Sequence, residues 1–180
     1  MNKPSLGMLQ IYTGNGKGKT TAAIGLGIRC TGSGGKVHLF SFMKNKSSEH
    51  VILEKLTPGF NYYIANRRPR GFWHKMSAEE RNDAISDARL AWDKVQALIA
   101  TRDCDMLILD EAMSLMKYEL VSVQEMLEVI EICKKSCIEL VLTGRDVPTE
   151  ITVMADLVTE MQEIKHFLAN GVKARRGIEY

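Results

Sequence analysis

Thr13-Gly-Asn-Gly-Lys-Gly-Lys-Thr20 is the stretch that decides the fold of this 180-residue chain. A short apolar segment, residues 8–12, precedes it, and a helix-like segment, residues 21–28, follows it. Glycines let successive backbone N–H groups point at phosphate oxygens, and the start of a helix adds its positive end. Strand, glycine-rich turn and helix in this order predict a phosphate-binding loop.

The residue types within this loop predict individual tasks. In such loops the lysine reaches the β- and γ-phosphates and the next hydroxyl holds Mg²⁺, which assigns these tasks to Lys19 and Thr20. The usual pattern G-x-x-x-x-G-K-[ST] begins with glycine, whereas this chain has Thr13 there, with Gly14 and Gly16 just inside to form the turn. The predicted nucleotide-binding residues are Thr13, Gly14, Asn15, Gly16, Lys17, Gly18, Lys19, Thr20 and Thr21.

Size and composition limit the classes of protein to which the chain can belong. A chain of 180 residues and 20.2 kDa fits one domain, residues 1–180, and a net charge of +2 gives no reason to expect nucleic acid or an anionic membrane as partner. No apolar run is long enough to span a bilayer, and the N-terminus lacks the apolar core of a signal peptide. We therefore expect a cytoplasmic protein with reduced cysteines, in which Cys133 and Cys137 share a buried helical face rather than a metal.

Apolar segments alternate with helix-like ones along the whole chain. Several of the strand-like segments are apolar throughout, as expected for strands that are covered on both faces of a parallel sheet. The patterns S-x-x-E at Ser77 and Ser122 are capping boxes that predict helix starts. This order predicts a three-layer α/β sandwich with a mostly parallel sheet, the P-loop NTPase architecture of the RecA-like type. The predicted strands are residues 8–12, 37–42, 60–64, 106–109, 138–142 and 157–159.

Two further strand ends carry charged residues that can complete a nucleotide site. Met106-Leu-Ile-Leu-Asp-Glu111 delivers Asp110 to the sheet edge, where it can ligate Mg²⁺ directly or through water, and Glu111 can bind Mg²⁺ or position a nucleophile. Arg145, after the apolar segment 138–142, either stabilises phosphate charge or lies in a surface turn. No N-K-x-D pattern for guanine follows, which favours ATP.

Beyond these motifs, the chain resembles a known family, the P-loop ATP:corrinoid adenosyltransferases, from about residue 7 to its end. Thr13–Ala23 resembles their phosphate loop, including the threonine in place of the first glycine. The other matching segments are Leu107–Glu111, Leu140–Asp146, Ala155–Met161, Ile164–His166 and Gly177–Tyr180. The combination with Val158-Thr-Glu-Met161 and the Gly-Ile-Glu-aromatic ending makes the resemblance specific.

The resemblance implies an enzyme that transfers the 5′-deoxyadenosyl group of ATP to the cobalt of a reduced corrinoid, in cobalamin biosynthesis or salvage. Co(I) attacks C5′ of the ribose and triphosphate leaves in one piece. ATP and Mg²⁺ serve this reaction, and the residues predicted above, Lys19, Thr20, Glu111 and Arg145, are its candidate catalytic residues. The resemblance also implies a homodimer, with a flavoprotein as a candidate electron donor.

Aromatic side chains beside the corrin are thought to remove an axial ligand of cobalt in this family, which makes Co(II) easier to reduce. Phe72 and Trp73 are the candidates here, although they are adjacent, whereas one residue separates the two aromatics in the family pattern. The alternative is that this pair packs against the core. His74 is either a cobalt ligand or a surface residue. Arg67, Arg68 and Arg70 either meet phosphate or corrin amides or form a solvated run.

Three other functions stay open at the level of the sequence. Another P-loop enzyme, such as a small-molecule kinase or an amide-forming ligase, would give products other than tripolyphosphate. A switch or motor subunit would release ADP and phosphate. A degenerate relative would bind corrinoid without transferring the adenosyl group.

Overall fold

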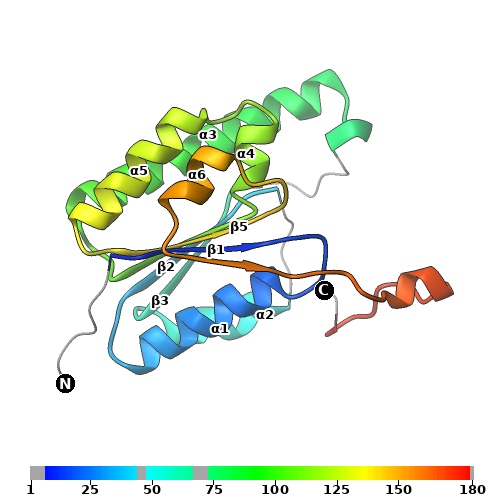
Figure 1. The fold of residues 1–180 in the computed structure, drawn as a ribbon, viewed down its shortest axis with the longest axis horizontal. Coiled ribbons are helices and arrows are strands. Elements are labelled where there is room, and N and C mark those ends of the chain that lie inside the picture. The colour runs from blue at the N-terminus through cyan, green and yellow to red at the C-terminus, as the bar shows by residue number, and fades with distance from the viewer. Residues whose placement is uncertain (1–6, 44–47, 67–72, 179–180) are drawn as a thin grey trace.

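The computed structural model describes residues 7–43, 48–66 and 73–178, and within these ranges a six-stranded sheet carries helices on both faces (Figure 1). The strands are β1 Leu9–Thr13, β2 Val37–Ser41, β3 Phe60–Ile64, β4 Met106–Asp110, β5 Glu139–Thr143 and β6 Leu157–Glu160. The α-helices are α1 Lys19–Gly32, α2 Glu49–Leu53, α3 Ala78–Thr101, α4 Met113–Lys117, α5 Val123–Lys135 and α6 Thr149–Met154. The 3₁₀ helices are η1 Glu54–Leu56, η2 Trp73–Lys75 and η3 Phe167–Asn170.

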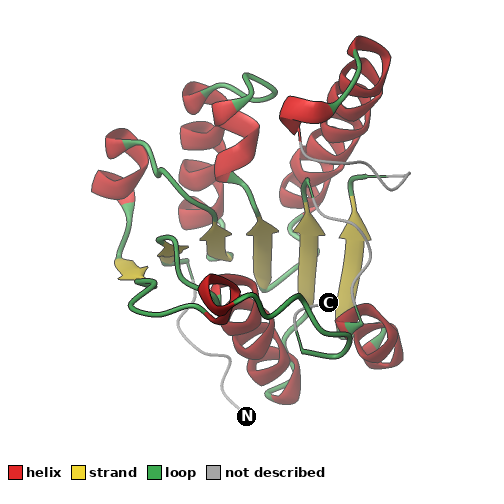
Figure 2. Cartoon of the chain, turned by 90° about the vertical axis from the view of Figure 1, so that its right-hand side faces the viewer, coloured by secondary structure: helices red, strands yellow, loops and turns green. Residues whose placement is uncertain are grey.

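The strand order is β3-β2-β4-β5-β1-β6, and every neighbouring pair is parallel. Figure 2 shows the strands side by side with helices on both sides of the sheet. Because the strands are parallel, their carboxyl ends meet at one edge, where α/β proteins place their ligand sites. The predicted three-layer α/β fold of the P-loop class is confirmed, and each strand lies within one residue of its predicted bounds.

Two apolar clusters fill the space on the two faces of the sheet. The larger cluster packs Leu107 and Leu109 of β4 against α3 and α5, and the smaller one packs Met106 and Ile108 against α1 and α2. Successive residues of a strand face opposite sides, so a strand that is covered on both sides must be apolar at every position. This explains the unbroken apolar run of β4.

The helix starts follow the two sequence signals. Ser77 and Ser122 each accept a hydrogen bond from the backbone N–H three residues on, while Glu80 and Glu125 reach back to the cap residues. Such capping boxes satisfy N–H groups that have no partner within the helix. Both predicted capping boxes are therefore confirmed, and they start α3 and α5.

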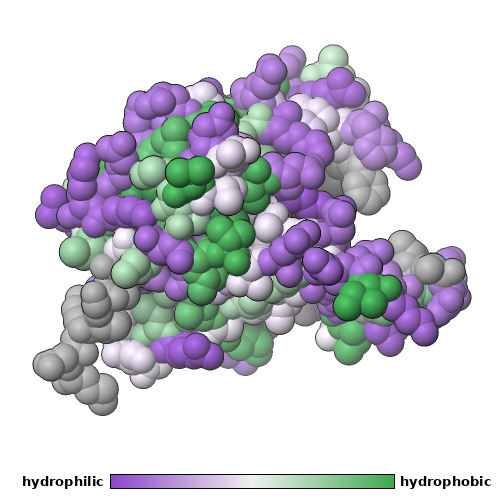
Figure 3. Space-filling view, viewed as in Figure 1, coloured by the Kyte–Doolittle hydropathy of each residue, from purple (hydrophilic) through white to green (hydrophobic). Residues whose placement is uncertain are grey.

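The edge strand β6 differs from the strands in the middle of the sheet. All four of its residues are exposed, and Leu157 and Val158 point to opposite faces with 44% and 45% of their surface accessible. Figure 3 shows apolar surface gathered over the region of α6 and β6. Among the described residues, no helix is long and apolar enough to cross a membrane.

Candidate active site

The turn between β1 and α1 has the backbone geometry of a ligand-binding loop. Gly14 and Gly18 have positive φ angles of 94° and 122°, which L-residues with side chains rarely adopt. Gly18 is the N-cap residue of α1, and no side chain caps this helix end. The first turn of a 14-residue helix therefore presents backbone N–H groups and its positive end toward the loop.

Lys19 lies inside the loop rather than in solvent. Only 8% of its surface is accessible, and its Nζ atom donates hydrogen bonds to the carbonyl oxygens of Gly14, at 2.7 Å, and Gly16, at 2.9 Å. The ammonium group has three donors in a compact point charge. Lys19 thus places a positive charge at the centre of the loop that is predicted to hold phosphate.

Asp110 ends β4 and accepts hydrogen bonds from hydroxyl groups of three other elements. Its Oδ1 accepts from Thr20 of α1 at 2.8 Å and from Thr143 of β5 at 2.7 Å, and its Oδ2 accepts from Ser41 of β2 at 3.3 Å. Asp110 is 1% exposed. The structure thus brings Thr20 and Asp110 together as predicted, while their roles toward Mg²⁺ stay predictions.

The hydroxyl network continues to the outer strand β3. Burial raises the pKa of Tyr62 well above its ordinary value, a hydrogen bond with Ser41 partly offsets this, and the charges of Asp110 and Glu49 raise the pKa further. Tyr62 therefore stays protonated. Its ring lies against that of the buried His50, with ring centroids 4.0 Å apart.

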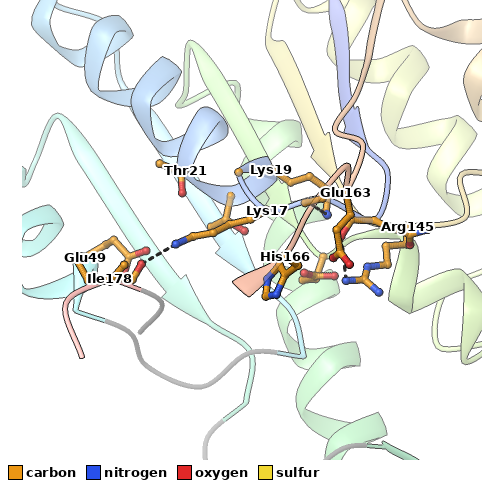
Figure 4. A pocket seen from close by; sticks show the side chains of 13 residues that line it. Lys17, Lys19, Thr21, Glu49, Arg145, Glu163, His166 and Ile178 are labelled. Carbon is orange, nitrogen blue, oxygen red and sulfur yellow. Dashed lines mark hydrogen bonds between the residues drawn. The ribbon is translucent and has the colours of Figure 1, made fainter. Parts of the chain in front are cut away.

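Glu111 and Arg145 reach the same pocket from two strand ends. Glu111 follows β4 in a left-handed conformation, with φ 60°, and its N–H donates to the Thr143 hydroxyl at 2.9 Å. Arg145 donates from Nη2 to the carbonyl oxygen of Asn15 at 3.4 Å and therefore lies against the phosphate loop. Figure 4 shows its guanidinium group beside the loop.

A pocket of about 300 Å³ lies where these parts meet, which is within the size range of small-molecule sites. Residues 15–21 of the loop, together with Glu111 and Arg145, line this pocket. The four predicted catalytic residues all belong to its lining. Thr13, Gly14 and Asp110 are not part of this lining.

Four residues of the lining were not predicted from the sequence. One is Glu49 of α2, and the other three are Glu163, His166 and Ile178, which follow β6. Figure 4 shows Glu163, His166 and Arg145 at one end of the pocket, and Glu49 and Ile178 near Lys17 at the other. For His166 and Ile178 the signal was the family resemblance of segments 164–166 and 177–180, to which no task was assigned. Glu49 and Glu163 lie outside every matching segment.

Backbone contacts hold this last part of the chain, which we call the C-terminal segment (residues 161–178), over the loop. The Gly16 N–H donates to the Met161 carbonyl at 2.7 Å, and the Met161 N–H donates to the Thr13 carbonyl at 2.8 Å. Lys17 Nζ donates to the Ile178 carbonyl at 3.0 Å. An added Cβ at Gly16 would lie 2.7 Å from the Met161 oxygen, so glycine is required for this approach.

Trp73 does not belong to the pocket lining. It lies in η2, partly buried against the larger apolar cluster, and stacks on Tyr118 with centroids 4.4 Å apart and planes 17° apart. His74 is exposed beside it. Phe72 and the arginines at 67, 68 and 70 lie outside the described residues. The role of the aromatic pair toward corrin stays a prediction.

The expectation for the cysteine pair was wrong for one of the two residues. Cys133 is buried in α5, but α5 ends at Lys135, and Cys137 lies beyond it, exposed, with φ 54°. Burial raises the pKa of both the Cys104 and the Cys133 thiols to about 12, so these thiols are inert. Within the described ranges, no group of three or more His, Cys, Asp or Glu residues is placed to hold a metal ion.

The parallel sheet, the loop with Lys19 and the hydrogen bond from Thr20 to the buried Asp110 define a P-loop nucleotide-binding enzyme. Comparison with known proteins gives the particular family. Residues 5–180 match the family model described as "ATP:corrinoid adenosyltransferase BtuR/CobO/CobP", and the chain belongs to this family.

Relatives from several bacteria match over nearly the whole chain. The corrinoid adenosyltransferase of Escherichia coli K12 is 32% identical over 177 residues, which cover 97% of this chain and 86% of the relative. The one from Pseudomonas aeruginosa is 30% identical over 177 residues, which cover 97% of this chain and 84% of the relative. Corrinoid adenosyltransferase CobA of Salmonella typhimurium is 31% identical over 176 residues, which cover 97% of this chain and 86% of the relative.

Proposed function

We propose that this chain transfers the 5′-deoxyadenosyl group of ATP to the cobalt of a reduced corrinoid. The observation that carries the proposal is the pocket itself: a phosphate loop with a buried lysine, in a chain that matches the adenosyltransferase family from residue 5 to residue 180. In this reaction the electron pair of Co(I) forms the Co–C5′ bond. The C5′–O bond breaks, its electron pair stays with the triphosphate, and cobalt ends formally as Co(III).

The substrate supplies the nucleophile, so the protein has to bind, orient and stabilise charge. Lys19 and the N–H groups at the start of α1 face the position of the triphosphate, where negative charge grows as the C5′–O bond breaks. Arg145, at the pocket wall, adds a guanidinium group that suits phosphate oxygens. Preorganised donors of this kind lower the barrier because they need not reorient during the reaction.

The oxygen ligands around Thr20 fit Mg²⁺, a hard cation that prefers oxygen. When bound, Mg²⁺ neutralises charge on the phosphate oxygens. The Thr20 hydroxyl donates its proton to Asp110, so its oxygen atom is the part of Thr20 that would bind the cation. Asp110 already accepts from three hydroxyls and is 1% exposed, which favours a role through Thr20 or water, while Glu111 offers a carboxylate in the pocket.

We also propose that residues 1–180 act as one nucleotide-binding domain, in a cytoplasmic homodimer that receives electrons through a flavoprotein. The family resemblance supports the dimer and the donor, and the exposed apolar side chains of β6 offer a surface for a second copy. The inert buried thiols of Cys104 and Cys133 suit a reducing compartment. Light scattering on the purified protein tests the dimer.

The test of the reaction is to mix the protein with MgATP and chemically reduced cob(I)alamin without oxygen. The corrinoid spectrum and the phosphate products are followed together, with a sample lacking corrinoid as control. A light-sensitive alkylcobalamin spectrum with tripolyphosphate is expected. ADP with an unchanged corrinoid spectrum would contradict the transferase and direct attention to a kinase or an ATP-hydrolysing subunit.

A further inference from the structure

Thr143, the last residue of β5, lies between the two acids that follow β4. Its side chain is 0% exposed. Its hydroxyl donates to Asp110 Oδ1 at 2.7 Å and accepts from the Glu111 N–H at 2.9 Å. A hydroxyl has one proton to donate, so this arrangement fixes the direction of both bonds.

Glu111 needs such a contact because of its backbone. With φ 60° it is in the left-handed region, which is unfavourable for a residue with a side chain. This turn places Glu111 in the lining of the pocket. The hydrogen bond to Thr143 therefore stabilises a conformation that the local sequence does not favour.

The next residue, Gly144, shows that the end of β5 packs directly on the start of α4, which follows the turn after β4. A Cβ at Gly144 would lie 2.6 Å from both Cβ and Cγ of Met113 and 3.1 Å from its backbone nitrogen. The Gly144 φ of 150° is also one that favours glycine. Two independent contacts, one polar and one steric, thus join the two strand ends.

We propose that Thr143 is a positioning residue, which aligns Glu111 and Asp110 for the bound Mg²⁺–triphosphate. The inference rests on the proposed function, since it names how that same site is held. Hydrogen bonds run from the Glu111 N–H to Thr143 and from Thr143 to Asp110, which also accepts from Thr20. A change at Thr143 therefore affects Glu111 and Asp110 and, through Asp110, the Thr20 hydroxyl that is proposed to bind Mg²⁺.

The test compares Thr143→Val, which keeps the shape but removes the hydroxyl, with Thr143→Ser, which keeps the hydroxyl. Calorimetry measures the affinity for ATP with EDTA and with excess Mg²⁺, and steady-state assays give kcat and KM. For valine, the gain in affinity from Mg²⁺ and the kcat should each fall by about tenfold or more, as for other residues that orient metal ligands. Serine should stay within about twofold of the wild type, because it keeps the same hydrogen bonds.

A merely structural Thr143 gives a different result. A folded valine variant with a lower melting temperature but an unchanged Mg²⁺ gain and kcat would overturn the proposal. If valine prevents folding, Thr143→Cys replaces it, since a thiol is only a weak donor and acceptor, and the same criterion applies. If the wild type forms no adenosylcorrinoid, the proposed function fails, while the calorimetric comparison still decides on Thr143.

A double-mutant cycle tests whether Thr143 acts through Glu111. Glu111→Gln and Thr143→Val are combined, and kcat is measured for each variant and the pair. If Thr143 serves to place the Glu111 carboxylate, the second change should have little further effect once the first is present. Fully additive losses would contradict that path.

Discussion

The two walls of the pocket are built in different ways. The inner wall, at the ends of β1, β4 and β5, is held by buried side chains: Lys19, Asp110 and Thr143 are at most 8% exposed. Lys19 donates to carbonyl oxygens of the loop, and Thr143 of β5 donates to Asp110 of β4. The outer wall is the C-terminal segment, whose residues 170–178 are all exposed and which is bound to the loop by backbone groups of Met161 and Ile178. The inner wall is thus formed before a ligand arrives, whereas the outer wall depends on a few contacts with the loop.

The largest effect is expected from the inner wall. Lys19→Ala should slow triphosphate release by about 10²–10³-fold, the usual loss when a preorganised donor to developing charge is removed. Lys135→Ala is the matched control, because Lys135 is exposed, pairs with Glu131 at 2.9 Å and does not line the pocket. It should have a much smaller effect. Circular dichroism checks the fold, and normal turnover by a folded Lys19→Ala would refute the phosphate assignment.

A second change separates the two walls sterically. In Gly16→Ala the new Cβ would lie 2.7 Å from the Met161 oxygen and 2.8 Å from the Gln162 oxygen, so the C-terminal segment has to move. Overpacking of this kind costs about 1–3 kcal/mol, and we expect kcat/KM for ATP to fall by about tenfold. Trypsin should then cleave faster after Lys165 and Lys173.

Gly25→Ala is the control for this experiment. Gly25 lies in α1 with nothing within 4 Å of an added Cβ, so alanine should leave cleavage unchanged and stabilise the helix by up to about 1 kcal/mol. Equal cleavage of the Gly16 and Gly25 variants would show that the outer wall does not depend on close approach to the loop.

Trp73 tests a third region, the link between β3 and α3. It stacks on Tyr118 rather than lining the pocket. If Trp73 helps to remove the axial ligand of cobalt, Trp73→Ala should slow the reaction from Co(II) about tenfold more than the reaction from pre-reduced Co(I). This ratio corresponds to a difference of about 1.4 kcal/mol in activation free energy. Trp73→Phe keeps a stacking ring and should lose less. Equal losses in both assays would mean that Trp73 only packs or binds.

Sequence predicted the inner wall well, for physical reasons. A strand covered on both faces must be apolar throughout, so β4 could be predicted from its apolar run. Parallel strands bring their carboxyl ends together at one edge, so Asp110 was expected beside the phosphate loop that contains Thr20. Thr143 directly follows the predicted strand 138–142, and no task was predicted for it. Its task depends on the left-handed turn at Glu111, which no residue type near it signals.

The outer wall was harder to predict. The C-terminal segment has no strong periodicity, and its place depends on backbone bonds such as that from Gly16 to Met161, which leave no pattern of side chains. Cys137 lies at a helix end, where the backbone conformation likewise could not be predicted from the side-chain pattern. The helix spacing placed it with Cys133, but the chain turns at φ 54° next to Gly7, which packs against its backbone.

The smallest effect should lie far from the pocket, at the start of α5. Ser122→Ala removes the hydroxyl that accepts from the Glu125 N–H at 3.1 Å, and the loss of such a cap costs about 1 kcal/mol of unfolding free energy. Urea denaturation at pH 7 measures this. Tryptic cleavage of the C-terminal segment should not change, because the cap belongs to the body that holds the inner wall.

The pH dependence of the unfolding free energy tests the Glu125 side of the same cap. The backbone N–H of Ser122 holds the pKa of Glu125 below its ordinary value of 4.5, with smaller contributions from Arg89 and the Ser122 hydroxyl. A lowered pKa stabilises the fold above pH 4.5, and this contribution is lost as the pH falls through the folded pKa. Ser122→Ala keeps the backbone donor, so most of the acid-dependent loss should remain, whereas Glu125→Gln should remove this part of it. An equal acid dependence in Glu125→Gln and the wild type would mean that other carboxylates govern stability there, and that the cap contributes through its neutral hydrogen bonds alone.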